Sequence, residues 1–395
     1  MKRRGLLRAG AGLAGAALLA PLLHGPRASA AGAYGRIDPA QLRGAFAPPA
    51  QAPQLLLEFA RWLDAEAPPG LPLAEGLSGD DGRWTSRFND FWIEEGADLS
   101  EQFAIFLTIG DGGDVALWNR EGGASSQWPV VLIGGEGEAV VLADSFAGFL
   151  ARLATAQFDE PDAGESDGFS WSEFQSDAES EGEEANADAR ADLAAARRAR
   201  KALGGWLRRQ TGQDDLAALA RRRVPHDALR RFFDAHVKAV HERQRASADW
   251  RALRALVQQD RPKGYRGSYD DLHVVCAGDF FRIGTMSERG RRFVAHARSG
   301  EIEPLVRALR EQRARRLPAH GLWFHARLRV YAADTVSDPQ QPGLVDLVAQ
   351  YLDDASDMSW LPRPPAAAIR ADCARAPRSA WWTPGWLRAI LATPN

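Results

Sequence analysis

A hydrolytic site is the first chemistry to test against this sequence, because carboxylates beside a histidine can act as general acids and bases. The best group of this kind consists of Asp270, Asp271, His273 and Asp279. No HExxH, paired CxxC, nucleophile-elbow or P-loop sequence accompanies it. We therefore expect no catalytic residues, and an exported hydrolase with its site in residues 264–395 stays as an alternative.

Metal ligation has equally little support. Two pairs of histidines are five positions apart, whereas ligands on one helix face are usually separated by three or four. These pairs are His236 with His241 and His320 with His325. The glycine-aspartate run at residues 110–114 lacks the downstream glutamate of an EF-hand loop, and a hairpin turn explains it. We expect neither a metal nor a cofactor.

The chain has two cysteines, Cys276 and Cys373, and they leave two interpretations open. In an oxidising compartment they could form one disulfide, which would contribute about 4–5 kcal/mol in the chain-entropy model. Cys276 also lies in the apolar run 274–276, where a buried free thiol is equally natural.

Any functional side chain must be positioned by helices and strands, and the sequence predicts these most clearly at residues 103–154. Phe103, Ile105, Leu107 and Ile109 occupy every second position, which predicts a strand with one strongly buried face. Glycine-rich turns follow at residues 110–114 and 134–137, and connections this short join antiparallel neighbours. The sequence therefore predicts a meander with strands at residues 103–109, 115–118, 129–133 and 139–142.

Past residue 142 the apolar period becomes that of a helix. Its apolar stripe consists of Phe146, Phe149, Leu150 and Leu153. Asp144 or Ser145 can cap its start. We expect this helix, and a shorter one at residues 54–64, to pack against the sheet.

The segment 129–154, PVVLIGGEGEAVVLADSFAGFLARLA, resembles the SMI1/KNR4 (SUKH) superfamily. The resemblance rests on a strand after the proline, a glycine-rich turn, a second strand and the helix motif Leu-Ala-x-Ser-Phe-x-x-Phe-Leu. It covers residues 103–154 and extends back to about residue 54. Upstream it departs from the family pattern, because Leu71-Pro72 precedes a glycine-rich stretch without the usual Asn-Gly turn.

The resemblance implies a non-enzymatic protein-binding module, which in this family most often neutralises a toxin in bacterial competition. It implies no catalytic residues. Residues 1–30 resemble a twin-arginine export signal, with Arg3-Arg4 at the start and Ala28-Ser29-Ala30 at the cleavage site. We expect export to the periplasm without a stable membrane span, or a cytoplasmic protein if the signal is not used. Usual family members stay in the cytosol.

Charge divides the remaining chain, although its net charge is only −3. Residues 80–144 contain thirteen acidic and three basic residues, and residues 193–263 contain eighteen basic and seven acidic ones. Residues 158–192 are rich in Asp, Glu, Ser and Gly, which predicts an acidic linker. The arginine clusters beyond it suit phosphate binding, but no nucleic-acid motif accompanies them, so we expect solvated helix faces.

The predicted fold class is α+β: an antiparallel SUKH-like meander with flanking helices, then a helical segment and a second α+β lobe. The expected parts are a signal at 1–30, a SUKH-like domain at 31–157, the linker at 158–192, basic helices at 193–263 and an unrecognised lobe at 264–395. In that lobe we expect strands at 272–276, 280–283 and 322–331, helices at 287–299, 301–316 and 344–352, and a packed tryptophan-rich tail.

Aromatic and acidic residues of the first lobe are the candidates for contacting a partner, since tryptophan dominates many interfaces. They are Trp84, Phe88, Trp92, Asp111, Asp114, Trp118 and Trp128. For the aromatic cluster at residues 84–92, packing against the sheet is the favoured explanation, and contact with a partner is the alternative. The acidic first lobe favours a basic protein partner, such as a toxin. An envelope-associated scaffold is the other alternative, and the oligomeric state stays open.

Overall fold

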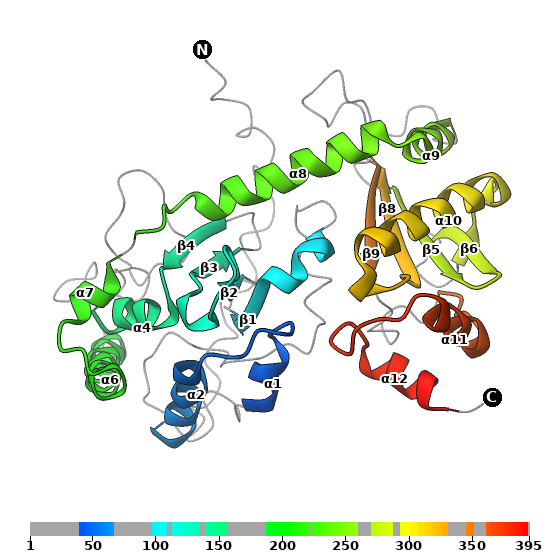
Figure 1. The fold of residues 1–395 in the computed structure, drawn as a ribbon. Coiled ribbons are helices and arrows are strands. Elements are labelled where there is room, and N and C mark those ends of the chain that lie inside the picture. Colours follow the sequence, from blue (N-terminus) through cyan, green and yellow to red (C-terminus); the bar gives the residue numbers. More distant parts are fainter. Residues whose placement is uncertain are drawn as a thin grey trace, which may run out of the picture.

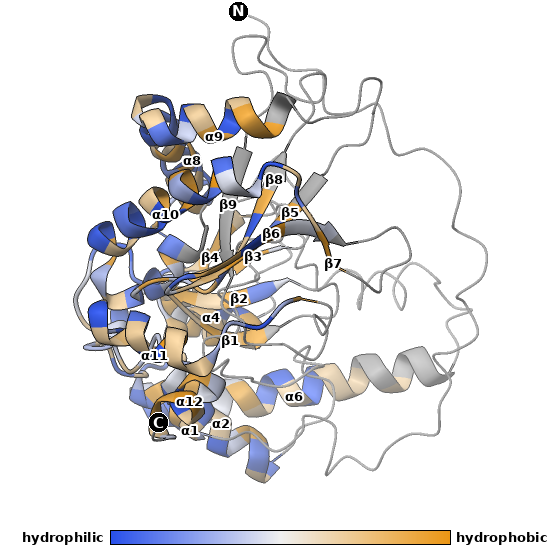
Figure 2. Cartoon of the chain, turned by 90° about the vertical axis from the view of Figure 1, so that its right-hand side faces the viewer, coloured by the Kyte–Doolittle hydropathy of each residue, from blue (hydrophilic) through white to orange (hydrophobic). Residues whose placement is uncertain are grey.

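The computed structural model describes residues 39–66, 96–108, 113–134, 139–155, 187–221, 223–259, 270–286, 293–330, 345–350 and 361–393. These residues form two antiparallel sheets with helices packed against them, so the α+β class is confirmed (Figure 1). In Figure 2, hydrophobic residues gather on the strands, while α10 (Ser299–Arg316) carries long hydrophilic runs. None of the described helices is long and apolar enough to cross a membrane.

The first sheet is a four-stranded meander in the order β1-β2-β3-β4. Its strands are β1 (Phe103–Thr108), β2 (Asp114–Trp118), β3 (Val130–Ile133) and β4 (Ala139–Ala143). Each strand pairs antiparallel with the next one in the sequence. The predicted hairpins are therefore confirmed.

Strand β1 departs from the predicted alternation. Its register with β2 shifts between Ile105 and Leu107, as at a β-bulge. Phe103 and Ile105 join the apolar cluster on one face of the sheet, whereas Leu107 joins the cluster on the other face. The prediction of a single buried face was wrong, because both faces of this sheet are covered by other elements.

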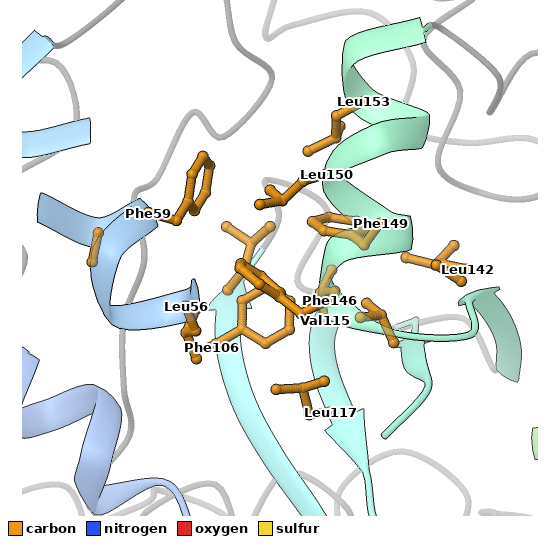
Figure 3. Close-up of a cluster of buried hydrophobic side chains, with 14 of the residues drawn as sticks. Leu56, Phe59, Phe106, Val115, Leu117, Leu142, Phe146, Phe149, Leu150 and Leu153 are labelled. Carbon is orange, nitrogen blue, oxygen red and sulfur yellow. The ribbon is translucent and has the colours of Figure 1, made fainter. Parts of the chain in front are cut away.

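One face is covered by α4 (Phe146–Thr155) and α2 (Gln54–Glu66), as the apolar stripes predicted (Figure 3). Ser145 caps α4, since its Oγ accepts a hydrogen bond from the Gly148 amide at 3.1 Å. The rings of Phe106 and Phe146 meet edge to face with centroids 5.3 Å apart. Such pairs add about 0.5–1.5 kcal/mol beyond their area burial.

The same face receives α6 (Ala187–Thr211) and α7 (Leu216–Ala220), which belong to the basic helical segment. Trp206 of α6 lies against Phe59 and Trp62 of α2, with ring centroids 5.7 and 5.5 Å apart. Helix α6 begins at Ala187, so the end of the predicted linker is helical. Residues 158–186 lie outside the described residues.

The other face of the first sheet is covered by the beginning of α8 (Ala228–Ala246). Phe233 of α8 packs on Phe103, with ring centroids 5.8 Å apart. Asp227 stands at the N-cap position but forms an ion pair with Arg231 at 3.1 Å instead of a side-chain cap. From this sheet α8 runs toward the second sheet, where α9 (Ala248–Gln259) follows it (Figure 1).

The second sheet has five strands in the order β7-β6-β5-β8-β9. They are β5 (Asp270–Ala277), β6 (Phe280–Met286), β7 (Phe293–Ala295), β8 (His325–Val330) and β9 (Val345–Gln350). Helices α9 and α10 share an apolar cluster with β5, β6 and β8. The remaining elements are α1 (Pro39–Gly44), α11 (Ala366–Arg375), α12 (Gly385–Ala392), and the short 3-10 helices η3 (Gly96–Gln102), η4 (Ser125–Gln127) and η6 (Pro318–His320).

Three predictions for residues 264–395 need correction. The helix predicted at residues 344–352 is strand β9. A helix was also predicted at residues 287–299, but the described part of this segment starts with strand β7. The strand predicted at 322–331 starts only at His325. Short apolar runs are ambiguous between helix and strand, and pairing with a neighbouring strand decides the outcome.

Gly284 allows the edge strand β7 to approach β6. A Cβ added at this position would lie 2.0 Å from the carbonyl oxygen of Val294. No side chain fits so close to a backbone atom, so only glycine preserves the pairing of Gly284 with Ala295.

Candidate functional site

The predicted partner-binding residues divide into two groups. Trp84, Phe88, Trp92 and Asp111 lie outside the described residues. Asp114, Trp118 and Trp128 are described, and only 4%, 1% and 3% of their surfaces are exposed. In this conformation these three side chains belong to the interior and do not present a contact surface.

Trp118 and Trp128 instead stand at the two ends of the β2–β3 turn (residues 119–127). Trp118 packs on Phe232 of α8 at 5.2 Å between ring centroids, and Trp128 stacks on Phe46 at 6.0 Å. Between them most of the turn is exposed, and Gly122 and Gly123 adopt positive φ angles of 77° and 83°. Two buried indoles thus hold an exposed, glycine-shaped turn in place.

A charged junction joins η3, which precedes the first sheet, to α10, which packs on the second sheet. The Asp98 side chain of η3 is only 4% exposed and accepts hydrogen bonds at Oδ1 from Arg313 Nε at 3.1 Å and Nη2 at 2.8 Å. Arg316 Nη1 donates to its Oδ2. Burial alone would raise the pKa of Asp98, but the charges of Arg313 and Arg316 outweigh burial and lower the pKa to about 2.

His320 and Trp382 extend this junction. Their rings stack with centroids 3.7 Å apart, and Trp382 Nε1 donates to the Glu101 carboxylate of η3. Arg313 Nη2 lies 3.3 Å from His320 Nδ1, and since guanidinium only donates, His320 carries its proton on Nε2. Burial and the charge of Arg313 lower the pKa of His320 to about 2, so the ring is neutral at pH 7.

His273, a member of the group considered as a hydrolytic candidate, pairs with another histidine. His273 forms its hydrogen bond with His325 of β8, with Nδ1 and Nε2 3.1 Å apart and the rings nearly parallel at 6°. Asp279 lies exposed in the β5–β6 turn. Burial lowers the pKa of His273 to about 4 and that of His325 to about 3, with Arg327 adding to both shifts.

A second buried ion pair, which sequence reasoning missed, lies between α10 and α11. Arg310 Nη2 donates to Asp372 Oδ2 at 2.7 Å, and both side chains are at most 3% exposed. Arg310 Nε donates to the carbonyl of Trp323 at 2.6 Å. The Gly278 amide also donates to Asp372, at 3.0 Å. This network ties α10, α11 and the β5–β6 turn together and leaves no sequence signature, because its members are distant in the chain.

The described part of the chain contains neither a disulfide nor a group of side chains that could hold a metal ion. Cys276 and Cys373 are both free thiols, and burial raises the pKa of each. No group of three or more His, Cys, Asp or Glu side chains there could hold a metal ion.

Comparison with models of known protein families gives no match to this chain. No curated protein and no solved structure matches it either.

Proposed function

We propose that the protein is a non-enzymatic protein-binding module of the SMI1/KNR4 (SUKH) type. One observation supports this most: four consecutive antiparallel strands lead directly into α4, and the motif residues Ser145, Phe146 and Phe149 cap that helix and pack it on the sheet. The most concrete version is an immunity protein that is exported through its twin-arginine-like signal and neutralises a toxin.

The β2–β3 turn is the contact surface that suits this role. Both faces of the first sheet are covered by helices, so a partner must reach the module at its turns or edges. In this turn Arg120 and Glu121 are exposed, and Arg120 lies over the ring of Trp118 at 5.9 Å. A turn held by two buried tryptophans loses little conformational freedom on binding, which favours affinity.

Several carboxylates of the acidic region are already bound within the protein, which bears on the charge expected of the partner. Asp98, Glu101 and Asp144 lie in the acidic region, yet each of them binds residues of the second half of the chain. Among the described residues of this region, Glu121 stays exposed on the proposed contact turn and can face a basic partner. High salt would weaken such a complex, and an affinity unchanged by salt would argue against a basic partner.

The proposal is tested by affinity capture with residues 31–395 as bait, from a lysate of the source organism. The retained protein is then purified, and its Kd is measured for the wild type and for the charge-swapped turn variant Arg120→Glu/Glu121→Arg. We expect one retained polypeptide and at least about a tenfold loss of affinity in the variant.

The matched control swaps charges on the exposed side of α2, with Arg61→Glu/Glu66→Arg, and should change the Kd by less than about twofold. Equal losses in both variants would reject the turn as the contact surface. Capture of no protein at all would reject the binding-module function.

A further inference from the structure

Helix α6 presents an arginine-rich face to solvent. Residues 193–213, which make up most of this helix, contain six basic residues and no acidic one. Because 3.6 residues complete a turn, four exposed basic side chains project from one side of the helix. This basic face consists of Arg198, Lys201, Arg208 and Arg209. The opposite side packs into the apolar cluster of the first sheet through Leu203 and Trp206.

In the part of the chain that the structure describes, no carboxylate forms an ion pair with this basic face. Arg208 Nε donates to the backbone carbonyl of Asp214 at 3.2 Å, which satisfies a donor but does not offset the charge. The carboxylate of Asp215 accepts from the Ala218 amide at 3.0 Å and so serves as the cap of α7. The four positive charges therefore call for an acidic partner from elsewhere.

The chain carries a matching acidic segment directly before α6. Residues 158–186 contain eleven acidic residues and no basic one. They lie outside the described residues, but both of their attachment points are described. Eleven carboxylates are more than enough to offset the four charges of the basic face.

The attachment points keep this acidic segment beside α6. On its N-terminal side, α4 ends at Thr155, and a Cβ at Gly204 of α6 would lie 3.7 Å from the Cβ of Ala154. On its C-terminal side, α6 begins at Ala187, about 26 Å from Gly204 along the helix axis at 1.5 Å per residue. Since Gly204 lies between Lys201 and Arg208, the connecting chain starts next to the basic face and ends on the same helix. A tether of this kind gives the carboxylates a high effective concentration at the basic face.

We propose that the basic face of α6 binds the acidic segment 158–186 of the same chain. A single exposed ion pair is weak, but several pairs and a short tether act together. The contact offsets the charge of the basic face and thereby weakens the binding of other polyanions to α6. It does not involve the β2–β3 turn and does not depend on the proposed protein-binding function.

Carbodiimide crosslinking of residues 31–395 tests the proposal, because this reagent couples a carboxylate to an amine only where the two are in contact. Lys201 lies on the basic face, and Lys238, an exposed residue of α8, is the matched control. We expect Lys201 to couple to carboxylates of residues 158–186 in the monomeric product, as identified by mass spectrometry of its peptides. Coupling of Lys238 to that segment should be at least about fivefold lower.

Salt provides a second condition for the same experiment. Adding about 0.5 M NaCl shortens the Debye length to about 4 Å and should lower the coupling of Lys201. Three results would overturn the proposal: no coupling of Lys201 to the segment, equal coupling of Lys238, or coupling in crosslinked dimers alone. The last of these would assign the basic face to a second copy of the chain.

Two double variants separate the basic face from the total charge of the protein. Arg198→Gln/Arg209→Gln should lower the coupling of Lys201 to the segment by about threefold or more, because two of the attracting charges are removed. Arg315→Gln/Arg388→Gln makes the same change in net charge at exposed positions of α10 and α12 and should leave the coupling unchanged. Equal effects of the two variants would mean that total charge controls the coupling and would reject the basic face as the binding surface.

Discussion

The Asp98 carboxylate accepts two hydrogen bonds from Arg313, at 3.1 and 2.8 Å, although the two residues are 215 positions apart in the sequence. Asp98 belongs to η3, which leads directly into β1, and Arg313 belongs to α10, which packs on the second sheet. Trp382 contacts Glu101 of the same 3-10 helix. Elements around the second sheet therefore bind the segment that starts the first sheet, and we expect the two sheets to unfold together.

Replacing Asp98 with alanine tests this coupling. The variant leaves Arg313 buried, at 6% exposure, without its carboxylate, and breaking a buried pair in this way costs about 3–5 kcal/mol. We expect Asp98→Ala to lower the free energy of unfolding in urea by that amount.

Two further variants separate the ion pair from general disturbance. Asp98→Ala combined with Arg313→Met should recover part of the loss, because the deeply buried charge is removed and Arg316, at 35% exposure, can be solvated by water. Glu121→Gln, which removes the partner of an exposed ion pair with Arg120, should change stability by less than about 0.5 kcal/mol. If the double variant is no more stable than Asp98→Ala, the unpaired charge is not the cause.

The buried histidine pair should make the protein sensitive to mild acid. The pKa values of His273 and His325 fall from 6.5 to about 4 and about 3 on folding. Between pH 6.5 and 4 the unfolded chain binds more protons at these residues than the folded protein, so stability falls as the pH falls. Each residue contributes a slope of at most about 1.4 kcal/mol per pH unit.

Urea unfolding of the wild type and of His325→Phe at several pH values between 7 and 4 measures this effect. The variant keeps an aromatic ring but has no group to protonate, so its stability should depend less steeply on pH. An unchanged slope would show that the pair does not control acid sensitivity. Asp98 does not interfere in this range, since its stabilisation is lost only as the pH falls from 3.8 to about 2.

Much of the first sheet was predictable because its information is local. Turn glycines fix the hairpins of the meander, and the spacing of Phe146, Phe149 and Leu150 fixes a helix next to it in the chain. Strands β7 and β9 were missed because they are edge strands, and their conformation depends on pairing with β6 and β8.

The candidate site was less predictable, because burial is decided by distant parts of the chain. Trp118 has the composition of an interface residue, but Phe232 of α8 covers it from more than a hundred positions away. The partner of Asp98 is likewise remote. Nothing in the spacing of residues near Asp98 or Trp118 distinguishes an exposed side chain from one buried by another element.

Asp144 offers a test of how the basic helices attach to the first sheet. Its carboxylate accepts hydrogen bonds from the amides of Arg223 at 2.7 Å and Val224 at 2.9 Å, just before α8. We expect Asp144→Ala to cost about 1–3 kcal/mol in urea unfolding, because two amides lose a charged acceptor. Ser145→Ala, which removes only the cap of α4, should cost about 1 kcal/mol. Equal losses would mean that water replaces Asp144 at both amides.

The contact between α4 and α7 depends on a glycine, and two alanine substitutions test this. A Cβ at Gly148 would lie 3.0 Å from the backbone oxygen of Leu219, whereas one at Gly205 of α6 would lie 3.6 Å from the flexible end of Arg209. Gly148→Ala should therefore destabilise the protein by about 1–3 kcal/mol through overpacking. Gly205→Ala should stabilise it by about 0.5–1 kcal/mol, because alanine favours the helix. If urea unfolding shows both variants to be stabilised, α7 can move away from α4 at little cost, and the close approach is not required.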